Sequence, residues 1–157
     1  MVAHETVFKA DLDGDGLRTI KTNGDFKIIG GSGNDTIYGK NGNDIIYGES
    51  GHDTLHGEGG NDILIGGVGA DYVHGGRGND TYIYNKGDGH DRFYDNGIAD
   101  AADKVVFGAG ITQDDLILRR EGNELKIYFK GTSTDTLRLI NQYYYDTTTN
   151  NESKQYH

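Results

Sequence analysis

Residues 30–83 consist of one nine-residue pattern written six times in succession: GGSGNDTIY, GKNGNDIIY, GESGHDTLH, GEGGNDILI, GGVGADYVH and GGRGNDTYI. The copies follow one another without a gap or a change of phase. Short repeats of this kind are typical of chains that build one elongated structure by stacking a small unit that cannot bury its apolar side alone. The repeat therefore decides the fold.

Four positions of the nonapeptide hold the same kind of residue in every copy. Positions 1 and 4 are glycine, at Gly30, Gly39, Gly48, Gly57, Gly66 and Gly75 and at Gly33, Gly42, Gly51, Gly60, Gly69 and Gly78. Position 6 is aspartate, at Asp35, Asp44, Asp53, Asp62, Asp71 and Asp80. Position 8 is large and mostly aliphatic, at Ile37, Ile46, Leu55, Leu64, Val73 and Tyr82.

Two less regular copies flank this array. A seventh copy, KGDGHDRFY, follows at 86–94 after a slip of two residues, and it supplies Asp91 and an inward-type Phe93. The stretch around Asn23, Gly24, Asp25 and Ile28 looks like a decayed copy before the first.

The spacing predicts a coil made of two nonapeptides. Positions 7–9 suit a short strand with one side chain facing inward and two facing outward. The other six residues suit a turn whose backbone conformations side chains would obstruct. One strand and one turn make half a circuit, so 18 residues complete it and every second copy stacks in parallel. We therefore predict an all-β fold, a parallel β-roll (a right-handed β-helix, or solenoid), with a small β-rich cap at its C-terminal end.

Stacking brings the aspartates into two columns. One column contains Asp35, Asp53, Asp71 and Asp91, and the other contains Asp44, Asp62 and Asp80. Carboxylates about 5 Å apart repel each other strongly unless a cation lies between them. Ligands that are all oxygens favour Ca²⁺ over Zn²⁺, and Mg²⁺ is disfavoured because it sheds water reluctantly and demands an octahedron. The pairs 35/53, 53/71, 44/62 and 62/80 give four complete sites, and 71/91 gives a fifth.

Backbone carbonyls of the glycine-rich turns are expected to complete the coordination. The predicted contributors are the glycines at positions 1 and 4 named above, together with Gly31. With further ions at the two ends, the chain is predicted to hold about four to seven Ca²⁺ ions. Because the apolar fraction is only 34%, calcium would supply much of the stability, and we expect binding and folding to be coupled.

The pattern GGxGxDxUx, in which U is apolar, resembles the repeat of the RTX (repeats-in-toxin) family of calcium-binding proteins. The resemblance covers residues 30–83 without a break. It implies a chain that leaves a Gram-negative bacterium in one step through the type I secretion machinery, which would be a partner. The chain would stay unfolded in the calcium-poor cytosol and fold outside, so a secreted or cell-surface location is implied.

The flanks hold further acidic candidates. DLDGDG at 11–16 begins like an EF-hand loop, with Asp11, Asp13 and Asp15 as candidate ligands, but Thr22 stands where a bidentate glutamate is expected. The alternative for this stretch is an acidic turn. Asp88 in the seventh copy is another candidate. We divide the chain into an N-terminal flank (1–29), the roll (30–94), a cap region (95–142) and a polar tail (143–157).

The cap region has its own β pattern. KVVF at 104–107 is a strand candidate, and Thr112 with Asp115 suggests an N-capped helical turn. Residues 116–120 and 125–129 flank a plausible hairpin turn, and 137–140 would add a third strand. This stretch resembles the domain that commonly follows such repeats in haemolysin-like proteins. We expect it to close the open end of the roll.

Outward positions 7 and 9 differ between the two predicted sheets. One sheet carries Thr36, Tyr38, Thr54, His56, Tyr72 and His74, and the other carries Ile45, Tyr47, Ile63, Ile65, Thr81 and Ile83. An exposed apolar face of this extent is unusual, so we expect the hairpin at 116–129 or a partner protein to cover it. His56 and His74 should stack and could bind a transition metal, although no third ligand is evident. The alternative is two half-exposed surface rings.

Composition and motifs argue against several functions. The net charge of −10 disfavours nucleic acid and anionic membranes as partners. The absence of cysteine removes disulfides and thiolate metal sites. No GxSxG surrounds Ser32 or Ser50, and no second histidine follows His4 at the metalloprotease spacing, so we predict no catalysis by this chain itself.

Three functions stay open at this point. The chain could be a calcium-dependent folding and export module of a larger toxin, enzyme or adhesin. It could be a calcium-stiffened part of a large surface adhesin, with a protein or glycan ligand on the face that carries Tyr38, Tyr72, His56 and His74. It could also be the C-terminal module of a secreted protease, lipase or epimerase whose catalytic domain lies outside this sequence.

Overall fold

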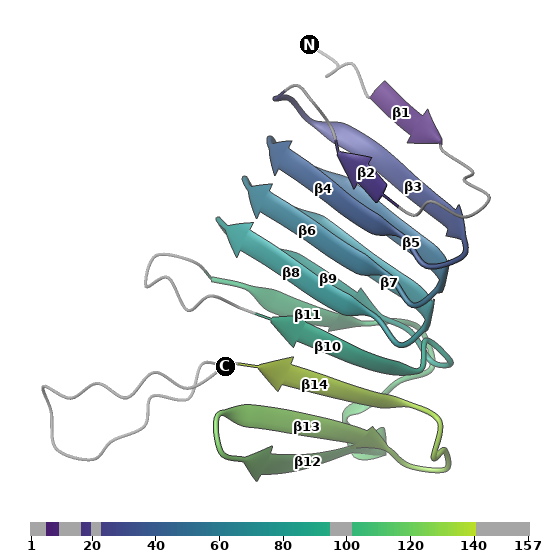
Figure 1. The fold of residues 1–157 in the computed structure, drawn as a ribbon. Helices are drawn as coiled ribbons and strands as arrows, with labels where there is room; N and C mark the ends of the chain where they lie inside the picture. Colours follow the sequence, from purple (N-terminus) through teal and green to yellow (C-terminus); the bar gives the residue numbers. More distant parts are fainter. Residues whose placement is uncertain (1–5, 10–16, 20–22, 95–101, 141–157) are drawn as a thin grey trace, which may run out of the picture.

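The computed structural model describes residues 6–9, 17–19, 23–94 and 102–140, and this part of the chain forms two facing β-sheets (Figure 1). The six-stranded sheet contains, in spatial order, β1 (Thr6–Lys9), β3 (Phe26–Ser32), β5 (Ile45–Gly51), β7 (Ile63–Gly69), β9 (Thr81–Tyr84) and β11 (Lys104–Phe107). The eight-stranded sheet contains β2 (Leu17–Thr19), β4 (Thr36–Asn41), β6 (Thr54–Gly59), β8 (Tyr72–Arg77), β10 (His90–Tyr94), β14 (Thr136–Ile140), β13 (Glu124–Phe129) and β12 (Leu116–Glu121).

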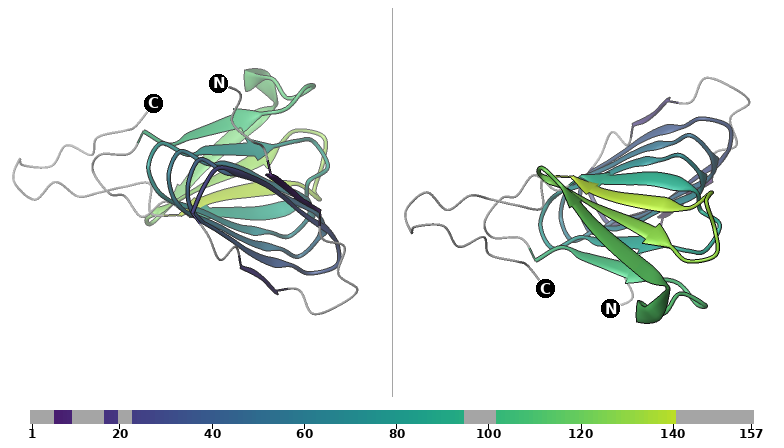
Figure 2. Two further views of the ribbon diagram at one scale, coloured as in Figure 1. Left: turned by 90° about the horizontal axis from the view of Figure 1, so that it is seen from above. Right: turned by 90° about the horizontal axis from the view of Figure 1, so that it is seen from below.

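Successive strands from β1 to β11 alternate between the two sheets, and within each sheet they run parallel. The register between neighbours in the repeat array is 18 residues, as for Ile46 opposite Leu64 and Leu55 opposite Val73. Seen along the stack, each coil is a flattened loop with one strand in each sheet (Figure 2). The prediction of an all-β parallel roll with a C-terminal β-rich region is confirmed.

The strands are longer than the predicted three residues. Pairing breaks at the glycine of position 1 and resumes at positions 2 and 3, so that Lys40 lies opposite Glu58. Position 2 takes a positive φ, which glycine adopts without strain, yet three copies carry a side chain there: Lys40 (φ 81°), Glu49 (φ 77°) and Glu58 (φ 76°). The glycine-rich half of each copy is therefore partly sheet.

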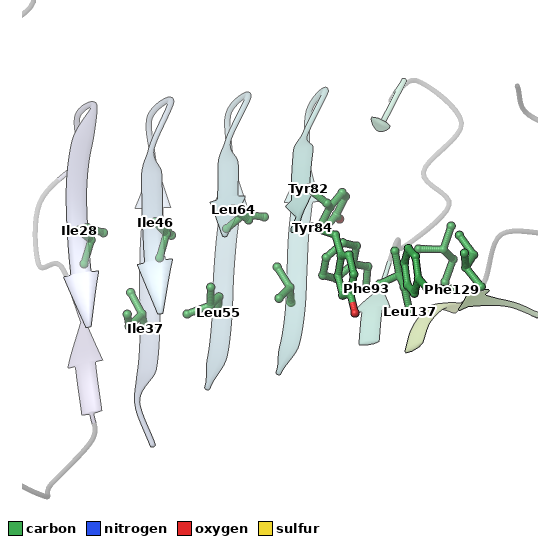
Figure 3. Packing of buried hydrophobic residues seen from close by; sticks show 13 residues of the cluster. Ile28, Ile37, Ile46, Leu55, Leu64, Tyr82, Tyr84, Phe93, Phe129 and Leu137 are labelled. Atoms are coloured by element: carbon green, nitrogen blue, oxygen red, sulfur yellow. The ribbon is translucent and has the colours of Figure 1, made fainter. Parts of the chain in front are cut away.

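The position-8 side chains fill the space between the sheets. They form a continuous line of buried residues from Ile28 to the C-terminal end of the roll (Figure 3). Towards that end aromatic rings replace aliphatic side chains, and Tyr84 stacks on Phe129 with 5.0 Å between ring centroids. The roll and the C-terminal strands thus share one core.

The decayed and seventh copies both belong to the roll. Ile28 lies opposite Ile46, which confirms a repeat at 23–29, but Phe26 rather than Asp25 is aligned with the aspartate position. Phe93 lies opposite Val73, so the two-residue slip is absorbed before β10 and the register is restored.

The region after residue 101 contains the predicted elements. The 3-10 turn η1 (Gln113–Asp115) begins after Thr112, whose backbone N–H and hydroxyl both donate hydrogen bonds to Oδ2 of Asp115. Strands β12 and β13 form the antiparallel hairpin, and β14 joins it to β10 in parallel. Strand β11, however, pairs with β9 inside the six-stranded sheet, so the solenoid continues to Phe107.

One expectation about this region is wrong. The hairpin β12–β13 continues the eight-stranded sheet edge to edge, and so it does not lie over the apolar outer face of the six-stranded sheet (Figure 1). The hairpin lies in the eight-stranded sheet because β14, which pairs with β13 of the hairpin, also pairs with β10. Coverage of the apolar face by a partner stays a prediction. Among the described residues, no helix has the length and hydrophobicity needed to cross a bilayer.

A glycine substitution tests the stacking of the coils. A Cβ on Gly51 (φ 144°) would overlap the carbonyl group of Gly33, whereas a Cβ on Gly122 (φ 61°), at the hairpin tip, meets no described atom within 4 Å. Replacing Gly122 by alanine should cost about 1 kcal/mol from backbone strain alone, and Gly51→Ala should cost about 3 kcal/mol or more because the clash is added. Thermal unfolding in saturating calcium measures both. Equal losses would contradict close stacking.

Candidate metal centre

The repeat aspartates form two columns along the roll. The first column contains Asp35, Asp53 and Asp71, which directly precede strands β4, β6 and β8, and Asp91, the second residue of β10. The second contains Asp44, Asp62, Asp80 and Asp103, which directly precede β5, β7, β9 and β11. The seven predicted members are at most 3% exposed. Burial of seven carboxyl groups in 157 residues requires specific partners, because an unpartnered buried charge is costly.

Sequence reasoning missed Asp103. Its Oδ1 accepts the backbone N–H of Asp80 at 2.8 Å, so it extends the second column by one coil. The residues from Asp103 to Val106 do repeat the D-x-U-x half of the nonapeptide. The glycines that normally precede this half are absent, so the nonapeptide pattern does not mark Asp103.

One oxygen of each carboxylate is used to hold the neighbouring coil. The backbone N–H of Asp53 donates to Oδ1 of Asp71 at 2.8 Å, and the N–H of Asp62 donates to Oδ1 of Asp80 at 2.8 Å. The same bond recurs along both columns, including the seventh copy, where Asp71 donates to Asp91 at 3.0 Å. The aspartates therefore link successive backbones every 18 residues, once across 20 residues at Asp91 and once across 23 at Asp103.

The second oxygen has a different environment. Oδ2 of Asp44, Asp53, Asp62 and Asp71 is buried and has no hydrogen-bond partner in the described part of the chain. Buried polar atoms in folded proteins are nearly always satisfied, so each of these oxygens calls for a ligand that the polypeptide does not provide. This recurrence in consecutive coils is the strongest sign of a bound cation.

The glycines at position 1 keep space open beside these oxygens. A Cβ on Gly39 would lie 2.5 Å from Oδ2 of Asp44 and 2.9 Å from the carbonyl oxygen of Gly57 in the next coil. A Cβ on Gly30 would lie 2.8 Å from both Oδ2 of Asp35 and the carbonyl oxygen of Gly48. A carboxylate and a carbonyl of the adjacent coil thus face one small space, which a side chain at position 1 would fill.

This set of donors fits calcium. All of the converging atoms are carboxylate or carbonyl oxygens, which Ca²⁺ prefers, and nitrogen and sulfur are absent from the columns. The described residues contain no cluster of three or more acidic, histidine or cysteine side chains arranged for a metal. An ion between coils would therefore use aspartates of the columns together with backbone carbonyls. The carbonyl roles of the predicted position-1 and position-4 glycines, and of Gly31, stay predictions.

Without a cation the columns are electrostatically unfavourable. Burial raises the pKa of Asp62 to about 7, against the lowering effect of the Asp44 N–H, and the negative charges of Asp80 and Asp44 raise it further. Burial likewise raises the pKa of Asp53 and of Asp71 to about 6, with neighbouring aspartates of the same column adding to the effect. The metal-free fold thus favours protonated carboxyl groups.

More carboxyl groups gather at the C-terminal end of the first column. Burial raises the pKa of Asp91 to about 8, and the charges of Asp71, Asp88 and Asp135 raise it further. Asp88, a predicted candidate, accepts hydrogen bonds from the backbone and side-chain nitrogens of Asn85. Asp135 accepts the N–H of Gly87 at 2.9 Å and so fastens the cap to the slipped turn. Asp135 lies outside the nonapeptide repeats, so no pattern in the sequence marks it as a member of this group.

The remaining candidates are less informative. Asp11, Asp13 and Asp15 lie outside the described residues. His56 and His74 stack as predicted, with 3.4 Å between their Nδ1 atoms, and Tyr38 and Tyr94 flank them. The described part of the chain supplies no third metal ligand there, so a transition-metal site is not supported.

Comparison with known proteins finds a match to the repeat region. The family model of the RTX calcium-binding nonapeptide repeat (4 copies) matches residues 27–55, 47–82 and 56–92. No curated protein matches the chain. Among solved structures, the chain is similar to the solution structure of the AlgE6R3 subunit from the Azotobacter vinelandii mannuronan C5-epimerase, with 23% identity, a TM-score of 0.40, and coverage of 83% of this chain and 78% of that one.

The raised pKa values predict opposite pH dependence with and without calcium. Carboxyl groups whose folded-state pKa lies above the ordinary value of 3.8 stabilise the metal-free fold fully below about pH 4, and this contribution is lost as the pH rises through 6 to 8. The calcium-free chain should therefore be better folded at pH 4.5 than at pH 8. Calcium affinity should instead increase over the same range, because protons compete with the ion.

Circular dichroism in calcium-depleted buffers, followed by calcium titrations at each pH, measures both trends. Asp62→Asn should reduce the change in stability of the metal-free chain with pH. Asp114→Asn, at an exposed position in η1, should leave that change as it is. A metal-free fold whose stability does not vary with pH would contradict the assignment of the buried columns.

Proposed function

We propose that this chain, whose residues 27–92 are RTX calcium-binding nonapeptide repeats, is a module that folds when calcium binds and so serves a larger exported protein. The observation that supports this most directly is the series of buried aspartate oxygens, at Asp44, Asp53, Asp62 and Asp71, that have no hydrogen-bond partner in the described part. RTX nonapeptide repeats bind calcium, and this chain offers one candidate position wherever two aspartates of a column follow each other.

The proposed ligand set extends the predicted pairs. The aspartates 35/53, 53/71 and 71/91 of the first column and 44/62, 62/80 and 80/103 of the second would each share an ion, with position-1 glycine carbonyls such as that of Gly57. These six pairs lie within the predicted range of about four to seven ions. When bound, calcium supplies positive charge between the carboxylates and a coordination partner for each Oδ2.

The energetics favour folding that depends on calcium. At free calcium tenfold above a dissociation constant, each site adds about 1.4 kcal/mol. Four such sites add about 6 kcal/mol, which is comparable with the whole stability of an ordinary domain. Without calcium this contribution is absent, and ionised carboxylates remain buried close together.

An extracellular role follows from this dependence. Weak calcium sites of extracellular modules fill at about 10⁻⁴ to 10⁻³ M, so a chain with such sites would be unfolded inside the cell and would fold after export. We propose export by a type I system, delivery to the medium or the cell surface, and a non-catalytic role for this chain. A catalytic domain, where the whole protein has one, would lie outside this sequence.

A calcium titration tests the proposal. The far-UV circular dichroism of the purified chain at pH 7.5 should change cooperatively from a disordered to a β spectrum as calcium is added, and Mg²⁺ at the same concentrations should not replace it. Isothermal titration calorimetry counts the ions. A chain that is equally folded and equally heat-resistant in excess chelator would refute calcium-dependent folding.

Substitutions within one column test the shared sites. Asp53→Asn keeps an acceptor for the N–H of Asp35 but removes one charge from two neighbouring pairs, whereas Asp35→Asn, at the start of the column, removes it from one. The calcium concentration at half-folding should rise about tenfold or more for Asp53→Asn, and clearly less for Asp35→Asn. Equal shifts would mean that ions are not shared between successive coils.

A further inference from the structure

The outer face of the eight-stranded sheet carries a line of basic side chains at its C-terminal end. One residue from each of four adjacent strands, on the side away from the core, belongs to it: Arg92 of β10, Arg138 of β14, Lys126 of β13 and Arg119 of β12. We refer to these four residues as the basic row. The chain as a whole has a net charge of −10, so this concentration of positive charge is local.

The register places the four cations directly opposite one another. Arg92 is the cross-strand partner of Arg138, Arg138 of Lys126, and Lys126 of Arg119. Like charges in directly opposed positions destabilise a sheet. At a strand spacing of about 4.8 Å, the row extends over roughly 14 Å. Three successive like-charge pairs do not stabilise the cap, so the need for a stable cap does not explain why they are present.

Two glutamates neutralise only the middle of the row. Arg138 forms an ion pair with Glu124, and Lys126 forms one with Glu121. Arg119 lies over the ring of Tyr128, 5.5 Å from its centroid, and neither Arg119 nor Arg92 has a carboxylate ion-pair partner within the described residues. Within the described part of the chain, both guanidinium ends of the row are therefore open to an anion.

A hollow of about 500 Å³ lies at the Arg92 end of the row. Arg92, Arg138, Tyr72, Thr54, Thr136 and His90 contribute to its lining, and so do Asp53 and Asp71 of the first aspartate column, whose charges an ion in that column would offset. Tyr72 is the cross-strand neighbour of Arg92, and its ring stacks with that of Tyr94 at 6.2 Å. Guanidinium groups, hydroxyl groups and a flat aromatic ring thus meet in one open depression.

We propose that this face binds an acidic polysaccharide, that is, an extended chain of sugar rings that carry carboxylate groups. The basic row would bind successive carboxylates, Arg through paired N–H donors, while Tyr72 would lie against a sugar ring and Thr54 and Thr136 would bond hydroxyl groups. A single-stranded nucleic acid fits less well, because its binding sites combine a basic groove with several aromatic rings on which successive bases stack, and Tyr72 is the one tyrosine, phenylalanine or tryptophan among the described residues that line the hollow. This site goes beyond the proposed folding role, and three of its four cations come from the cap.

A binding assay on the calcium-loaded full chain tests the site. The probe is a fluorescently labelled octamer of galacturonic acid, followed by anisotropy at one fixed free-calcium concentration. Arg92→Gln and Arg119→Gln should each weaken binding about tenfold. Arg77→Gln is the matched control, because it removes the same charge from an exposed position at the end of β8, outside the row.

Two further ligands define the specificity. The same octamer reduced to its neutral sugar should bind far more weakly, and so should a single-stranded DNA of equal charge. Equal losses in Arg92→Gln, Arg119→Gln and Arg77→Gln would show a general charge effect and overturn the site, as would equal binding of the neutral octamer or of DNA. The calcium transition in circular dichroism is measured on every variant, so a failure of calcium-dependent folding is distinguished from a failure of sugar binding.

Discussion

Each repeat aspartate has two carboxylate oxygens with different tasks, and the architecture depends on that division. Oδ1 accepts the backbone N–H of the aspartate in the preceding coil, as Asp71 does for Asp53. This bond requires the coils to be in register, at 18 residues within the array, at 20 across the slip to Asp91 and at 23 for Asp103. Oδ2 is then held inside the turn with no hydrogen-bond partner from the described chain at four successive positions. The geometry that fixes the register thus creates the demand for a cation.

Glycine is required in the same turns for two separate reasons. At position 4, the coils approach so closely that a Cβ on Gly60 would overlap the carbonyl of Gly42. At position 1, a Cβ would occupy the space in front of the aspartate. Position 2 is restricted in some coils only: Lys40, Glu49 and Glu58 carry a side chain at positive φ there, whereas a Cβ on Gly67 would overlap the carbonyl of Glu49. Glu58 accepts the strain of its positive φ, and its ion pair with Lys40 in the preceding coil offsets part of it.

The sequence predicts most of the roll because its period carries the information. Because the spacing is constant, the residues that stack on one another can be identified by counting along the sequence. This predicts the two aspartate columns and the line of inward-facing apolar side chains. Prediction fails where the period stops. Asp103 lacks the preceding glycines, and β11 was therefore assigned to the cap although it pairs with β9. The direction of the hairpin depends on the pairing of β14 with β10, a contact between residues about 46 apart that no local pattern encodes.

The two ends of the molecule are stabilised by different means. Near the N-terminal end, each coil buries one aliphatic side chain per sheet, such as Ile28 or Ile37, and is otherwise held by strand pairing and by side-chain acceptors at positions 5 and 6 of the repeat. Towards the C-terminal end, Tyr84, Phe93 and Phe129 bury far more apolar area, and their rings stack across the boundary between roll and cap. Apolar burial there does not require an ion. Within the array at 30–83, dependence on calcium must therefore increase with distance from the cap, because the contribution of the core per coil falls while each repeat keeps one buried aspartate.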